Sequence, residues 1–138
     1  MIRIYYSMEY KIAREKIMRV VFQMDAHNTF DYKQLHIIKE DEKILKNKRA
    51  IKAFELINEH INEIDYTIKC NTSGWSIDRI SKTELAILRT AVCEMLYMDD
   101  IPIPVSINEA VDIAKKYGYE RSYAFVNAVL RKIGDKIG

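Results

Sequence analysis

The sequence predicts an all-α protein, a compact bundle of about six or seven helices. The chain has 138 residues but only 4 glycines and 2 prolines. β-Sandwiches and β-barrels need turn residues at short intervals, and doubly wound α/β folds need glycine-rich loops. This chain has too few glycines and prolines to form any of these folds. With 49% hydrophobic and 30% charged residues, the composition also excludes disorder caused by low hydrophobicity.

The first helix is predicted over residues 8–26. Apolar residues recur there every three or four positions, basic residues lie on the opposite face, and Ser7 is placed to cap the helix. Thr29 is a candidate cap for a short second helix with Leu35 on its apolar side. The mixed-charge residues 39–43 are expected to form a solvated helix end or loop.

A long helical pattern runs from about Asn47 to Cys70, which predicts either one long helix or two helices with a bend between His60 and Ile64. Residues 71–74, Asn-Thr-Ser-Gly, form a stop signal. Ser81 and Glu84 then match a capping box, in which each side chain accepts a hydrogen bond from the other residue's backbone. The helix that follows is apolar around most of its circumference, so we expect it at the centre of the fold.

Two more helices are predicted in the last third of the chain. Ser106 and Glu109 match a second capping box, which predicts that a helix begins there, after the two prolines. This helix is predicted to end at Tyr117, with Gly118 as the residue just after it. The last helix is predicted over about residues 121–133, where apolar residues again have helical spacing.

Composition and motifs narrow the function. Two cysteines, Cys70 and Cys93, cannot build a disulfide framework, and no zinc-ligand spacing is present, so we expect a reduced, cytoplasmic protein without metal or cofactor. Cys93 is expected to be buried. No apolar run is long enough to span a membrane, and no signal peptide is recognisable. Motifs for phosphate-loop, serine-hydrolase or zinc-protease chemistry are absent, so no enzymatic activity is predicted.

Basic residues gather in two segments, although the net charge of the chain is only +2. The first helix carries Lys11, Arg14 and Arg19 beside Tyr10. The last segment carries Lys115, Lys116, Arg121, Arg131, Lys132 and Lys136. If the first and last helices are neighbours, these residues form one basic patch with Tyr119 and Tyr123 nearby, an arrangement that suits single-stranded RNA. An ordinary solvated surface is the alternative.

Several strings of the sequence resemble the helices of one known family. ISKTELAILRTA at 80–91, followed by Glu94 and by Ile-Pro at 101–102, is similar to the central helix of the NusB family of bacterial transcription antitermination factors. Its next helix resembles VSINEAVDIAKKYG at 105–118, and its last helix resembles FVNAVL at 125–130. Its first helix is similar to Ala-Arg-Glu at 13–15 and to VVFQMD at 20–25. The resemblance is strong over 75–130 and weak over 28–72.

The resemblance implies a single domain, 1–138, of two packed helical subdomains at about 1–72 and 73–138. Members of the family bind the boxA element of nascent ribosomal RNA together with the ribosomal protein NusE, within an antitermination complex on RNA polymerase. The fold also occurs as the RNA-binding domain of a ribosomal RNA methyltransferase, but this chain has no appended cofactor-binding domain, so that activity is not expected. The alternative function is a helical interaction module that can form a homodimer and that binds RNA weakly or not at all.

The resemblance also implies two groups of site residues. The RNA-binding group falls on Tyr10, Lys11, Arg14, Arg121, Ser122 and Phe125, and the partner-binding group falls on Phe22 and Glu84. Lys11, Arg14 and Arg121 are expected to contact phosphates. Phe22 and Phe125 also fit a hydrophobic core, and Glu84 is explained by its capping box. Family members often begin with consecutive arginines, which this chain lacks, so we expect weak RNA binding alone and tighter binding with a partner.

Overall fold

The computed structural model describes residues 8–36, 38, 41–74, 76–118 and 121–137, with the side chains of 8–12 and 42 left out. These residues form helices and no strand, which confirms the all-α prediction. The elements, in chain order, are α2 (Met8–Ala26), η1 (Tyr32–Gln34), α4 (Glu42–Leu45), α5 (Lys48–Lys69), η2 (Ile77–Arg79), α6 (Lys82–Tyr97), α7 (Ile103–Tyr117) and α8 (Ser122–Ile137). None of these helices is long and apolar enough to cross a membrane.

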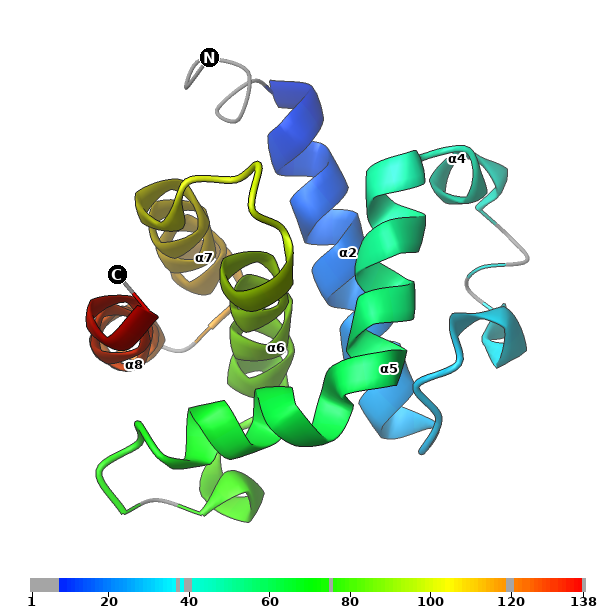
Figure 1. Ribbon diagram of the computed structural model, residues 1–138. Coiled ribbons are helices and arrows are strands. Elements are labelled where there is room, and N and C mark those ends of the chain that lie inside the picture. The colour runs from blue at the N-terminus through cyan, green and yellow to red at the C-terminus, as the bar shows by residue number, and fades with distance from the viewer. Residues whose placement is uncertain (1–7, 37, 39–40, 75, 119–120, 138) are drawn as a thin grey trace.

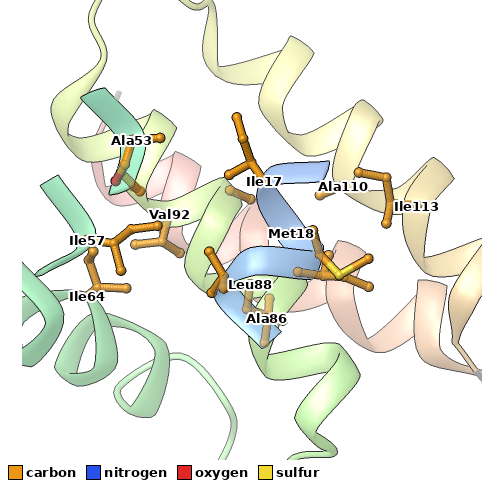
Figure 2. Close-up of a cluster of buried hydrophobic side chains, with 14 of the residues drawn as sticks. Ile17, Met18, Ala53, Ile57, Ile64, Ala86, Leu88, Val92, Ala110 and Ile113 are labelled. Carbon is orange, nitrogen blue, oxygen red and sulfur yellow. The ribbon is translucent and has the colours of Figure 1, made fainter. Parts of the chain in front are cut away.

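Helix α6 is the centre of the fold. It packs against α2 and α5 on one side and against α7 and α8 on the other (Figure 1). All eleven residues from Leu85 to Met95 are buried, which confirms the prediction of a central helix. Figure 2 shows Leu88 and Val92 of α6 among apolar side chains of α2, α5 and α7. One hydrophobic core therefore joins helices from both ends of the chain, and the subdomain boundary near residue 72 stays a prediction.

Local sequence signals explain how several helices begin and bend. The capping box of α6 is present: the backbone nitrogen of Glu84 donates to Ser81 Oγ at 3.1 Å, and that of Ser81 donates to Glu84 Oε1 at 3.3 Å. Helix α5 begins after Asn47, whose side chain accepts from the backbone of Ala50. The predicted bend in α5 lies at His60, where φ is −115° and ψ is 19°.

Two predicted helix starts are wrong. Helix α7 begins at Ile103 rather than Ser106, because a proline in the first turn loses no helical hydrogen bond and its fixed φ suits a helix start. Ser106 is buried within α7, and its hydroxyl donates to Glu94 Oε1 at 2.9 Å. Thr29 does not cap a helix either. The short turn η1 is capped instead by Asp31, which accepts from the backbone of Lys33. The last helix extends to Ile137, further than predicted.

Two buried arginines tie α6 to its neighbours. Arg14 of α2 donates from Nε to Glu94 of α6 at 3.2 Å, and its Nη1 lies 3.8 Å from Glu109 of α7. Five residues earlier on α6, Arg89 forms a bidentate pair with Asp65 of α5, with both N–O distances 2.8 Å. Buried charges are costly unless they are paired, so these contacts define how the helices are arranged.

We expect Arg14→Met to lower the free energy of unfolding by about 3–5 kcal/mol, because the change leaves Glu94 and Glu109 buried without their cation. Urea denaturation followed by circular dichroism measures this loss. The double variant Arg14→Met/Glu94→Met is the control, since it removes a charge from each side of the pair, and it should recover part of the stability. A double variant no more stable than Arg14→Met would contradict the ion-pair explanation.

Candidate nucleic-acid interface

Helices α2 and α7 meet at the surface through charged and aromatic side chains. Tyr117 is at the centre of this contact: its hydroxyl accepts from Arg19 Nη2 at 2.8 Å and donates to Glu15 Oε2 at 2.9 Å. Lys116 Nζ donates to both carboxylate oxygens of Glu15, at 3.0 and 3.1 Å. The helical spacing of Glu15 and Arg19, four residues apart on α2, presents both of them to the end of α7.

Cations also lie over the tyrosine rings. The Arg19 guanidinium is 5.4 Å from the centre of the Tyr117 ring, and the Lys116 ammonium is 5.3 Å from it. Lys115 lies 5.4 Å from the ring centre of Tyr123, which is 43% exposed on the first turn of α8. We call Glu15, Arg19, Lys115, Lys116, Tyr117 and Tyr123 the basic–aromatic surface. Cations next to accessible rings supply the phosphate contacts and the stacking that single-stranded RNA uses.

Glu15 limits the free positive charge of this surface. Partial burial raises the pKa of Glu15, but hydrogen bonds from Lys116 and Tyr117 outweigh it and hold the pKa below its usual value. The same contact with Glu15 raises the pKa of Lys116. Both groups are therefore charged near neutral pH, and one carboxylate offsets part of the charge of Lys116 and Arg19.

The structure corrects the prediction for Arg14. Its side chain is buried, with the residue only 4% exposed, and its guanidinium pairs with Glu94 and Glu109 rather than facing solvent. A phosphate cannot reach it while this arrangement holds, so its role is to position α2. The side chains of Tyr10 and Lys11, predicted beside it, lie outside the described part of the structure.

The residues predicted at the start of the last helix differ in exposure. Arg121 is exposed, two positions before Tyr123, which is also exposed. Ser122 is 4% exposed because α7 and α8 come together there: a Cβ added to Gly118 would lie 2.4 Å from Ser122 Cβ. Ser122 is therefore packed where the two helices meet, and its role in RNA binding stays a prediction. Phe125 is half-buried against the core.

The partner-binding residues lie where α2 and α6 converge. Phe22 is half-buried against the core, and Glu84 is half-buried in the capping box of α6. An ion pair of 3.1 Å between Asp25 and Lys82 links the end of α2 to the start of α6. Phe22 and Glu84 each keep some exposed surface. Their role in binding a partner stays a prediction.

Only part of the basic patch expected from adjacent first and last helices is formed, because Lys115 and Lys116 belong to the basic–aromatic surface with Arg19, whereas Lys132 and Lys136 do not. Helix α8 packs on α6 and α7, and α7 supplies the polar contacts to α2 described above. Lys132 and Lys136 reach the loop after α5 instead.

The sequence analysis did not predict Glu15 and Tyr117 as site residues. The four-residue spacing of Glu15 and Arg19 is the signal that places both side chains on one face of α2.

Burial raises the pKa of the Cys93 thiol to about 12, so this cysteine is a packed core residue, as predicted. The described part of the chain contains no group of three or more histidine, cysteine, aspartate or glutamate side chains that could hold a metal ion.

Comparison with known proteins identifies the family. The model of the NusB family matches residues 11–135. The chain belongs to the NusB family. Among its relatives, the transcription antitermination protein NusB of Ruminiclostridium cellulolyticum is 40% identical over 125 residues, covering 89% of this chain and 86% of the relative. The NusB of Oceanobacillus iheyensis is 42% identical over 121 residues, covering 88% and 94%.

Solved structures agree with this assignment. NusB of T. maritima superimposes with a TM-score of 0.80 at 34% identity and covers 91% of this chain and 90% of that one. A crystal structure of the antitermination factors NusB and NusE in complex with double-stranded RNA matches with a TM-score of 0.79 at 31% identity, covering 94% of this chain and 99% of that one. The predicted NusB-like fold is therefore confirmed.

We expect Glu15→Gln to raise RNA affinity about fourfold at 0.15 M salt, because it removes the carboxylate that offsets Lys116 and Arg19. The dependence of log affinity on log salt should steepen by about 0.7. Fluorescence anisotropy with a labelled single-stranded RNA measures both quantities. Glu55→Gln, on the exposed face of α5, is the matched control. An equal gain in both variants would mean that net charge, rather than the basic–aromatic surface, sets the affinity.

Proposed function

We propose that this chain is a transcription antitermination factor that binds a boxA-type RNA together with the ribosomal protein NusE. The observation that carries the proposal is the match to a NusB chain solved with NusE and RNA, which extends over 99% of that chain. The RNA in that complex is double-stranded, and the likeness supports RNA binding by this fold.

The basic–aromatic surface is the part of this chain that we assign to RNA. Arg19, Lys115 and Lys116 supply cations for phosphates, and the exposed ring of Tyr123 is available for stacking on a base. Arg121 adds a further cation at the start of α8. Tyr10 and Lys11, on the first turn of α2, are proposed to extend the same surface, while the buried Arg14 holds α2 in place.

The partner surface is assigned to the junction of α2 and α6. Phe22 offers apolar area there, and Glu84 offers a carboxylate to a basic ribosomal protein. The Asp25–Lys82 ion pair holds the two helices together at this point. RNA and partner would thus bind to different parts of α2, which allows both to bind at once.

The proposed role requires no catalysis and no cofactor from this chain. Its task is to hold RNA and partner together within the antitermination complex on RNA polymerase. Transcription in bacteria takes place in the cytoplasm, so this role assigns the protein to that compartment, in agreement with the cysteine content.

Charge reversal at the basic–aromatic surface tests the RNA assignment. We expect Lys115→Glu/Lys116→Glu to lower the affinity for a boxA-like RNA by about tenfold or more at 0.15 M salt, because attractive phosphate contacts become repulsive. Lys43→Glu/Lys46→Glu, on exposed residues of α4 and the residue after it, should leave the affinity nearly unchanged. If neither pair affects RNA binding while NusE still binds, the chain is a protein-interaction module instead.

A second measurement tests the joint action of the two partners. We expect the protein alone to bind boxA-like RNA weakly and the protein with NusE to bind it at least about tenfold more tightly, because NusE adds basic surface of its own. Filter binding with and without NusE compares the two affinities. Equal, tight binding in both cases would show that the chain needs no partner.

A further inference from the structure

The loop between α5 and η2 is held in place by two lysines of α8. Lys132 Nζ donates to Ser73 Oγ at 2.8 Å, and Lys136 Nζ donates to Asn71 Oδ1 at 2.8 Å. Asn71 is itself buried and donates from Nδ2 to the carbonyl of Thr67 at 2.8 Å. The two lysines, one helical turn apart, therefore have defined positions, unlike ordinary surface lysines.

The loop surrounds an open hollow of about 480 Å³, lined by Ser73, Gly74, Ser76 and Arg79. Ser73 and Gly74 are consecutive left-handed residues, with φ of 53° and 88°. This conformation is costly for a serine, and the Ser73 hydroxyl accepts the hydrogen bond from Lys132. Ser76 makes no capping hydrogen bond to η2, so its hydroxyl remains available in the hollow.

The charge at this hollow is positive and not neutralised by ion pairing. Lys132 and Lys136 bind neutral side chains, and within the described residues neither they nor Arg79 form an ion pair. Asp78 and Asp135 are close in sequence but are exposed, and neither of them pairs with these cations. Arg79 and the hydroxyl groups of Ser73 and Ser76 line the hollow, and Lys132 lies at its edge through its bond to Ser73, while Lys136 binds the same loop at Asn71. Cations and hydroxyl groups in this arrangement are suited to the oxygens of phosphate groups.

The hollow is separate from the basic–aromatic surface. At a helical rise of about 1.5 Å per residue, Lys132 and Lys136 lie roughly 16 and 22 Å along α8 from Arg121. Helix α8 has three basic residues, Arg131, Lys132 and Lys136, with Arg121 just before it, and a single acidic one, Asp135. A cationic helix that joins two phosphate-binding regions fits an extended polyanion better than a small anion.

We propose that this site, which we call the loop–lysine site and which comprises residues 71–74, Ser76, Arg79, Lys132 and Lys136, binds backbone phosphates of RNA outside the segment held by the basic–aromatic surface. The proposal rests on the proposed function and adds a second contact to it. Contacts to phosphates carry no sequence information, so this site would add affinity and set the path of the RNA without changing base preference.

The test compares two RNAs in the presence of NusE. One is a boxA-like strand of about 12 nucleotides, and the other is the same strand extended by about 10 nucleotides at each end. We expect Lys132→Gln/Lys136→Gln to lower the affinity for the extended RNA about tenfold at 0.15 M salt and to reduce its salt dependence by about 1.4. The affinity for the short RNA should not change. Lys48→Gln/Lys52→Gln, with the same spacing on α5, is the matched control.

Each alternative result has a distinct meaning. If Lys132→Gln/Lys136→Gln leaves the affinity for the extended RNA unchanged, or lowers the affinity for both RNAs equally, the loop–lysine site is overturned. In both cases the proposed function stays intact. Failure of the wild-type protein to bind the short RNA would instead overturn the proposed function. Inorganic phosphate is the third probe: if it binds at the site and the extension adds no affinity, the site is for a small anion and the proposal fails.

Discussion

The arrangement of the bundle depends on the burial of α6 and on the two ion pairs that this burial imposes. A helix enclosed by four others cannot keep Arg89 and Glu94 charged without partners, because an unpaired buried charge costs several kcal/mol. Asp65 and Arg14 supply those partners from α5 and α2, and Glu109 adds a contact from α7. The apolar core sets how closely the helices pack, and these polar contacts set their rotation and register.

The surface chemistry follows from that register. With Arg14 turned inward, the next residue, Glu15, and Arg19 one turn further along point toward the end of α7, where Lys116 and Tyr117 bind them. The charge available for RNA is therefore a result of internal packing. Internal packing also sets the charge near the C-terminal end of α8, where Lys132 and Lys136 bind a loop instead of an acidic residue.

Much of the fold could be predicted from local patterns. The start of α6, the length of α5 and its bend at His60 depend on residues close together in the sequence, and the structure confirms them. The second capping box fails for a physical reason: Ser106 has the right spacing from Glu109, but the preceding prolines favour an earlier helix start. The same four-residue pattern therefore has two outcomes, depending on the residues before it.

The sequence by itself determined the helical class, most helix boundaries and the resemblance to the NusB family, because these depend on spacing within one or two helical turns. Only the tertiary structure decided which basic residues face solvent. Arg14 and Lys116 look alike in the sequence, yet Arg14 is buried against a glutamate 80 positions away and Lys116 is exposed. Pairing over such distances is set by how helices pack, and no local pattern records it.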